Sequence, residues 1–182
     1  MIIARQKRKE NIAEYLLYMW QVEDLIRAYG FDMEQIRLHV IDKYDQPEEV
    51  KAEIAQWYEE LIRMMKEEGR TEKGHIQLNE SVIMALTDLH LRLLKSPKEM
   101  VYSAAYYKTL PHIVQLRTKS GDADVPELET CFSAIYGFLL LKMQKKEVSR
   151  ETEEAIRQIS TFLALLSEKY RADMAGELEL DE

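Results

Sequence analysis

Cysteine, glycine and proline are all scarce in this sequence of 182 residues. A single cysteine excludes an internal disulfide framework and is compatible with a reducing compartment. Six glycines and four prolines are too few for the many turns of an all-β fold. The longest apolar run, around residues 131–143, is too short to span a bilayer. These absences predict a soluble protein in the cytoplasm, with no membrane partner.

Signatures of catalysis and of nucleic-acid binding are also missing from the sequence. It has no glycine-rich phosphate loop, no serine nucleophile motif and no cysteine pair with zinc spacing. The formal net charge of −8 argues against a nucleic-acid partner. The one basic cluster, Arg5 with residues 7–9, is interpreted as a solvated N-terminus, and Glu14 interrupts the apolar segment that a signal peptide needs. We therefore expect no cofactor, and no catalytic residue is assigned.

The most informative segment that is present is a predicted long helix, Lys7–Tyr29, after a short irregular start. Its apolar side chains fall on one broad arc when placed at about 100° per residue. Leu17 and Trp20 extend this apolar surface sideways, which favours a position near the middle of a helical bundle. Glu23 is the exception, because it projects from the apolar arc. The arc consists of Ile12, Tyr15, Leu16, Met19, Val22, Leu25, Ile26 and Tyr29.

Helical periodicity continues through the rest of the chain. Predicted starts are marked by a capping side chain or by proline in the first turn. Together these signals predict an all-α, up-and-down bundle of about seven helices, with the first helix central. Residues 1–175 are expected to form a single domain, followed by an acidic tail at 176–182, and residues 69–77 form the longest non-helical linker. After the first helix, the expected starts are Asp32, Pro47, Asn79, Ser96, Pro126 and Ser149.

Several segments carry a resemblance to a known family. The segment KRKENIAEYLLYMWQVEDLIRAY is the most specific, and four further segments extend the likeness over nearly the whole chain. On these residues the sequence resembles a bacterial family named only as domain of unknown function 4924. The resemblance implies an intracellular bacterial protein of about this size, and it supplies no catalytic residues. The further segments are Trp57-Tyr58, Gly74-His75, Tyr136-Gly137-Phe138 and the closing helix.

Three residues are candidates for lining a ligand pocket. Glu23 is the charged residue on the apolar arc, and Arg27 lies one turn later, within reach of it. His90 falls on the buried side of its predicted helix. Without metal-ligand spacing around it, His90 is interpreted mainly as a core histidine whose polar atoms are satisfied. A cavity onto which Glu23, Arg27 and His90 converge would instead favour a small-molecule-binding bundle or an unrecognised enzyme.

The 69–77 linker contains two weaker patterns. Glu72 and His75 form one Glu-x-x-His match, but dinuclear metal sites in helical bundles need a second copy. Arg70 and His75 resemble, at those two positions only, the Arg…His pattern of helical ribonucleases of the higher-eukaryote-and-prokaryote nucleotide-binding type. That chemistry needs both side chains on an ordered helix, whereas Gly69 and Gly74 disfavour one. We expect neither a tightly held metal nor nuclease activity here.

Small residues form a second face on the helix predicted from Pro126. Thr130, Ser133, Ala134 and Gly137 follow one another at helical spacing beside the apolar core face. Small residues allow a neighbouring backbone to approach closely, so this stripe is a candidate interface between two copies of the chain. Intramolecular helices could cover it instead. The favoured interpretation of the whole sequence is a non-enzymatic interaction protein that forms a homodimer.

Overall fold

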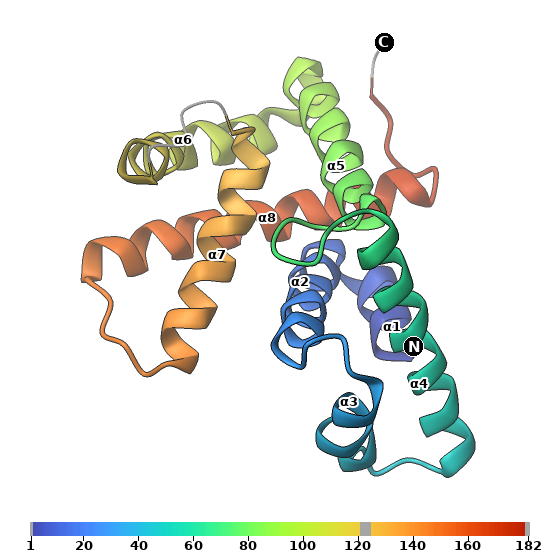
Figure 1. The fold of residues 1–182 in the computed structure, drawn as a ribbon. Coiled ribbons are helices and arrows are strands. Elements are labelled where there is room, and N and C mark those ends of the chain that lie inside the picture. Colours follow the sequence, from blue (N-terminus) through green and yellow to red (C-terminus); the bar gives the residue numbers. More distant parts are fainter. Residues whose placement is uncertain (1, 121–124, 181–182) are drawn as a thin grey trace. The chain divides into compact units, whose positions relative to one another are not determined.

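The computed structural model describes residues 2–120 and 125–180, and all regular structure in these ranges is helical (Figure 1). The all-α prediction is therefore confirmed, while the up-and-down arrangement and the central first helix stay predictions. The described residues form eight α-helices and two short 3-10 helices. They are α1 (Ile2–Glu10), α2 (Ile12–Ala28), α3 (Met33–His39), η1 (Ile41–Lys43), α4 (Glu48–Glu67), α5 (Gln77–Lys95), η2 (Pro97–Glu99), α6 (Met100–Ser120), α7 (Glu127–Met143) and α8 (Arg150–Met174).

The helix count exceeds the expected seven because the predicted first helix is two helices. The chain is already helical from Ile2, and the helix breaks at Asn11. The Asn11 side-chain oxygen accepts a hydrogen bond from Ala13 N at 3.0 Å, so Asn11 caps the start of α2. The predicted segment Lys7–Tyr29 was thus wrong at its beginning, since an asparagine within a periodic pattern is a start signal as well as a helix residue.

The chain divides into two units, and each is described by itself. The first unit comprises Met1–Lys9 and Glu14–Val82, and the second comprises Glu10–Ala13 and Ile83–Glu182. The expectation of a single domain over 1–175 stays a prediction. Residues 177–180 of the predicted acidic tail form no helix, and its last two residues lie outside the described part of the chain.

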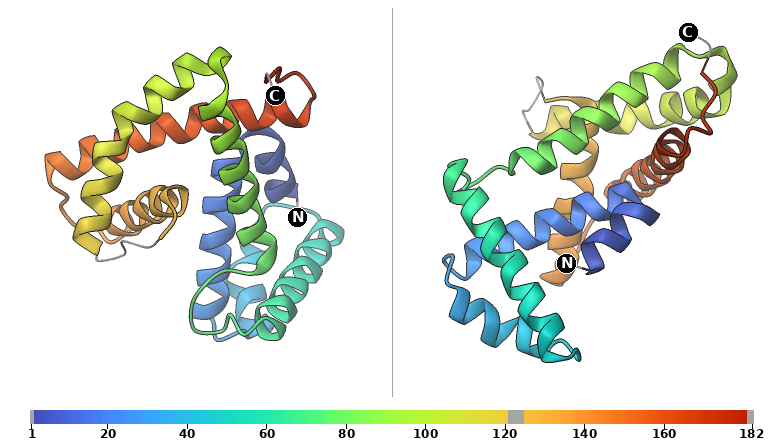
Figure 2. Two further views of the ribbon diagram at one scale, coloured as in Figure 1. Left: turned by 90° about the horizontal axis from the view of Figure 1, so that it is seen from above. Right: turned by 90° about the vertical axis from the view of Figure 1, so that its right-hand side faces the viewer.

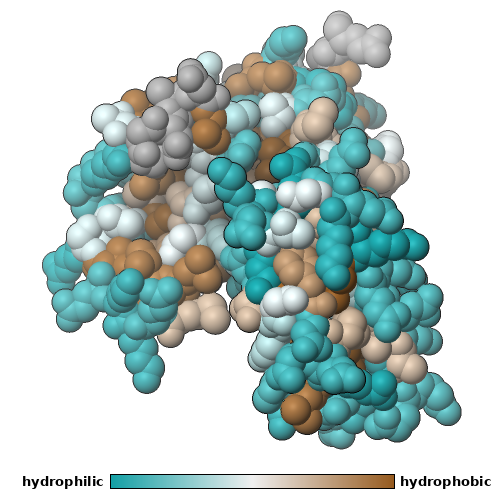
Figure 3. Space-filling view, viewed as in Figure 1, coloured by the Kyte–Doolittle hydropathy of each residue, from teal (hydrophilic) through white to brown (hydrophobic). Residues whose placement is uncertain are grey.

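Buried side chains of α2 and α4 supply much of the first unit's core. Leu16 and Ile26 of α2 and Met65 of α4 have no exposed surface. α4 is strongly amphipathic, and the surface over it is mostly teal in Figure 3. Between these helices, Gly30 (φ +61°) follows α2, and Asp32 caps α3 by accepting hydrogen bonds from the next helical N–H groups, as predicted.

In the second unit, α8 contacts both α6 and α7. Phe162 and Leu163 of α8 are buried, as is Phe132 of α7. Two ion pairs add polar links to α8: Lys169 with the buried Glu99 at 2.6 Å, and Arg92 with Asp173 at 2.7 Å. On α7, the buried side chains Leu128, Cys131, Phe132 and Ile135 mark the face that is directed inward.

Helix α6 continues through Pro111. Figure 2 shows α6 changing direction along its length, which is the effect expected of a proline that removes one backbone hydrogen bond and crowds the preceding turn. Ser96 and Ser149 cap η2 and α8 as predicted. Within the described ranges, every helix is too short or too polar to cross a bilayer.

Candidate functional site

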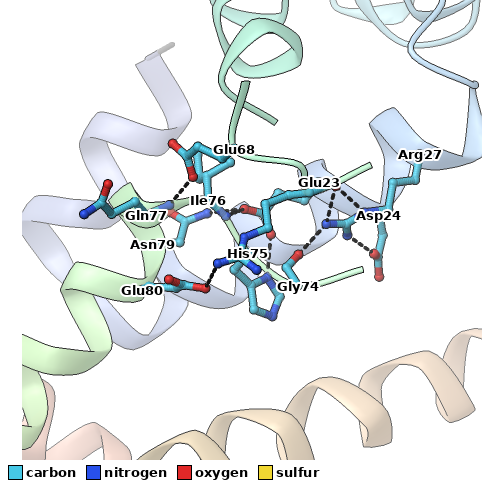
Figure 4. A network of polar contacts seen from close by, with 11 residues as sticks. Glu23, Asp24, Arg27, Glu68, Gly74, His75, Ile76, Gln77, Asn79 and Glu80 are labelled. Atoms are coloured by element: carbon cyan, nitrogen blue, oxygen red, sulfur yellow. Dashed lines mark hydrogen bonds and ion pairs between the residues drawn. The ribbon is translucent and has the colours of Figure 1, made fainter. Parts of the chain in front are cut away.

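The most elaborate polar site of the first unit is built around Glu23 of α2 (Figure 4). Its side chain has no exposed surface. Oε1 accepts hydrogen bonds from Ile76 N at 3.0 Å and from Asn79 Nδ2 at 2.7 Å. Oε2 accepts one from His75 Nδ1 at 2.5 Å. A buried carboxylate is tolerated when several donors replace its lost hydration, and Glu23 has three.

The imidazole of His75 is fixed in both position and orientation. Its ring stacks on the indole of Trp20, with 4.0 Å between ring centroids and 7° between the planes. Glu23 binds Nδ1, so the second ring nitrogen, Nε2, is the one left for other interactions. The side chain of His75 is 26% exposed, whereas that of Glu23 is fully buried. This arrangement holds a partly exposed histidine against a buried carboxylate.

Arg27 ties the linker between α4 and α5 to α2. Its guanidinium donates to the carbonyl oxygen of Arg70 from two nitrogens, at 3.3 and 3.2 Å, and to that of Gly74. It also pairs with Asp24 at 2.8 Å. The expected contact from Arg27 back to Glu23 is replaced by these contacts, because the fork of arginine donors matches the linker carbonyls.

Two carboxylates from other parts of the unit cap the start of α5. Glu23 accepts from Ile76 N, and Glu68 Oε2 accepts from Gln77 N at 2.6 Å. The first N–H groups of a helix have no partner within it, and the positive end of the helix dipole favours negative charge there. Glu23 and Glu68 therefore help to decide where α5 begins, two residues before the predicted Asn79.

The two weak patterns of the linker are engaged in this same network. His75 is bound to Glu23, and Arg70 pairs with Glu80 at 2.8 Å. Both Arg70 and His75 lie between helices, not on one. Across the described residues, no group of three or more histidine, cysteine, aspartate or glutamate side chains is placed to hold a metal ion. Glu72 and His75 thus have no metal-binding partners among them.

His90 belongs to the second unit and has its own surroundings there. It is 4% exposed and shares a 2.7 Å hydrogen bond between Nδ1 and the hydroxyl of Tyr102. The rings of Tyr106 and Phe162 meet it edge to face, at centroid distances of 4.8 and 5.8 Å. Burial lowers the pKa of His90, although the charge of Glu127 opposes that shift. These contacts are those of a core histidine.

The three residues predicted to line one pocket belong to different units. Glu23 and Arg27 lie in the first unit, and His90 lies in the second. The partner that sequence reasoning missed is His75, which lies 52 residues from Glu23. Gly74 is the sequence feature that could have indicated this contact, because a glycine allows a sharp turn of the chain immediately before His75. In the structure, Gly74 has a φ of +81°.

The candidate interface residues lie on α7. Thr130 is buried, and its hydroxyl donates to the carbonyl of Pro126 at 3.1 Å. Ser133 is exposed, while Ala134 and Gly137 are half-buried. A Cβ atom added at Gly137 would meet no other atom within 4 Å. Three of the four predicted residues thus remain accessible, and Gly137 faces open space.

Comparison with known protein families identifies a match over nearly the whole chain. The family model described as "Domain of unknown function (DUF4924)" matches residues 1–177. No curated protein and no solved structure matches the chain.

Proposed function

Because the chain belongs to the DUF4924 family, whose function is unknown, we propose a function from its own surface: it is a non-enzymatic interaction protein that associates with a second copy through α7. The single observation that carries this proposal is the open space beside Gly137. Glycine within a helix is unfavourable by about 1 kcal/mol relative to alanine. A helical glycine that leaves room for a side chain in its own chain is explained if a partner backbone approaches it.

Large apolar side chains around Gly137 support the proposal. Phe138, Leu139, Leu140 and Leu141 are each only half-buried, and Met143 is 72% exposed. In Figure 3, brown side chains gather over the C-terminal part of α7 and the start of α8. A partly exposed apolar patch is compatible with a surface that another protein covers. The hydrophobic effect would drive its burial, and a two-fold homodimer is the commonest outcome for a chain that self-associates.

Light scattering during size-exclusion chromatography tests the proposal. We expect the parent protein to be a dimer at tens of micromolar. Gly137→Leu should obstruct the approach of a second backbone, and Leu140→Glu should place a charge in the apolar patch. Both variants should be monomers with the helical circular dichroism of the parent.

Met84→Glu is the matched control, because Met84 is an apolar residue of α5 that is 71% exposed and lies outside α7. It should leave the dimer unchanged. A monomeric parent rejects the proposal. A Gly137→Leu protein that unfolds also counts against it, because that result places this face inside the core of one chain.

The alternative function is a small-molecule-binding site or an unrecognised enzyme, and the observation that favours it is the orientation of His75. A histidine held at Nδ1 by a carboxylate presents Nε2 in a defined direction, as acid–base and metal-binding histidines do. Thermal-shift screening against metabolites tests it. A stabilising compound should lose its effect in His75→Ala and keep it in His39→Ala, since His39 stacks on Tyr29 away from the Glu23 contacts.

Location and source remain part of the proposal. The single cysteine supports a cytoplasmic location, and the resemblance stated from the sequence segments supports a bacterial source. The net charge of −8 supports the expectation that nucleic acid is not its partner.

A further inference from the structure

Residue sizes along α7 are arranged in a way that defines how two copies would pair. Gly137 lies near the middle of the helix Glu127–Met143. The small residues Ser133 and Ala134 precede it by about one turn, and the large residues Leu140 and Leu141 follow it by about one turn. All of them except the exposed Ser133 are half-buried.

Charge is also divided along α7. Glu127 and Glu129 occupy the first turn, and Glu127 accepts a hydrogen bond from the Tyr106 hydroxyl at 2.6 Å. Lys142 lies in the last turn, and Lys145 and Lys146 follow the helix, with Glu147 next. Within the described part of the chain, Lys142 is paired with Glu153 at 2.7 Å, but Glu129 and Lys145 have no ion-pair partner. The first turn of α7 is therefore acidic, and the segment from Lys142 to Lys146 is basic.

From the distribution of side-chain size and of charge along α7, we infer that the α7 helices of two copies pair antiparallel across a two-fold axis at Gly137. This inference rests on the proposed self-association and adds its geometry. In that register, Leu140 and Leu141 of one copy lie level with Ser133 and Ala134 of the other, so large side chains meet small ones. The two Gly137 residues meet at the axis, where the backbones come closest.

The antiparallel direction also brings unlike charges together. The acidic first turn of each α7 lies beside the basic end of its partner. A parallel pair would instead place acidic turns together and lysines together, which opposes association. It would also set leucine against leucine and serine against serine. Size and charge both favour the antiparallel direction, and both select a second copy of this chain as the partner.

Engineered cysteines test the geometry. Under mild oxidation, Gly137→Cys should form a dimer through a disulfide between its two copies, because only residues at the axis lie close to themselves. Glu129→Cys should not, since two copies of residue 129 would be about 24 Å apart along an antiparallel pair. A mixture of Ser133→Cys and Leu140→Cys proteins should cross-link, although each alone should do so poorly. Intact mass measured without reductant reads out the products.

The native cysteine does not interfere with this test. Cys131 has no exposed surface, and burial raises the pKa of its thiol to about 12, so the parent protein is an unreactive control. Charge reversal gives a second readout. Changing Lys145 and Lys146 to Glu should raise the dimer Kd by about fivefold at low salt, and adding Glu129→Lys to that chain should recover part of the loss.

The outcomes separate the inference from the proposed function. A dimer that Leu140→Glu disrupts, but in which Gly137→Cys does not cross-link, leaves self-association through α7 intact and overturns the register. Cross-linking of Glu129→Cys to itself indicates a parallel pair and also overturns it. A parent that is monomeric by light scattering removes the proposed function and this inference together.

Discussion

Glu23 is a buried carboxylate whose three donors come from one short segment, residues 75–79. Replacing it with alanine removes the charge but leaves Ile76 N and the Asn79 amide without their acceptor. Leaving a buried donor without its acceptor costs about 1–3 kcal/mol for each group. We therefore expect Glu23→Ala to lower the free energy of unfolding in urea by about that amount for each donor left unpaired.

Glu23→Gln is the informative comparison for that experiment. Glutamine keeps an acceptor oxygen for Ile76 and Asn79 and presents an amide to His75, so its cost should be smaller than that of alanine. Equal stabilities for the parent and Glu23→Ala would show that the network around Glu23 contributes nothing to the fold.

His90 gives the second unit a pH dependence whose direction is set by burial. Its pKa is lowered in the folded protein from an ordinary value of 6.5, so the unfolded chain binds more protons near that pH. The stability contributed by neutral His90 is complete above about pH 6.5 and is lost as the pH falls towards its folded-state pKa.

The free energy of unfolding should therefore decrease from pH 7 to pH 5, and His90→Gln should reduce that decrease. Glutamine retains a polar partner for Tyr102 and does not titrate. Urea titrations at three pH values measure the difference. A pH profile that is unchanged in His90→Gln would contradict the assignment, and His112→Gln serves as a comparison at a less buried histidine.

At the scale of elements, the start of a helix was predictable where a capping residue lies next to it in the sequence. It was not predictable where the start depends on residues far away in the sequence. Asp32, Ser96 and Ser149 act as the predicted caps because each bonds to backbone within its own turn. The start of α5 depends instead on Glu23 and Glu68, which lie elsewhere in the sequence. Periodicity reports which face of a helix is apolar, but it does not report which distant side chain a buried charge will meet.

The sequence predicts that the linker between α4 and α5 is the most mobile part of the chain. The structure ties it to α2 through Arg27, which donates to the carbonyls of Arg70 and Gly74. Arg27→Ala should release these carbonyls, and local opening should then expose the linker. Trypsin cleavage after Arg70 and Lys73 should become faster than in the parent protein.

Arg27→Lys and Arg63→Ala complete that experiment. Lysine keeps the charge but lacks the fork that reaches two carbonyls, so Arg27→Lys should behave like Arg27→Ala. Arg63 is an exposed arginine of α4, and its loss should leave cleavage in the linker unchanged. Linker cleavage that is equally slow in all four proteins would show that Arg27 does not hold this segment.

For the whole molecule, composition and periodicity together were enough to predict the fold class. Scarce glycine and proline, together with continuous 3.6-residue periodicity, correspond to a chain whose described residues contain helices and no strand. The family was likewise recognisable from the segment around α2. The division into two units was not, because it depends on which helices share contacts, and a single sequence does not contain that information.

Cooperativity between the units can be measured because both tryptophans lie in the first one. Trp20 and Trp57 belong to that unit, so tryptophan fluorescence reports its unfolding, whereas circular dichroism reports the helices of both. Helix α5 begins in the first unit and continues into the second, with the division between Val82 and Ile83. Melting one unit alone would end α5 in mid-helix and leave a new, uncapped terminus.

If residues 1–175 form the predicted single domain, the protein should unfold in one cooperative transition. Fluorescence and circular dichroism should give the same midpoint in urea, and Glu23→Ala in the first unit should lower both midpoints together. His90→Gln, in the second unit, should also shift the fluorescence midpoint at pH 7 in step with the dichroism midpoint, whatever the size of the shift. Separate midpoints, or a Glu23→Ala variant that moves only the fluorescence transition, would show two units that unfold independently although α5 contributes residues to both.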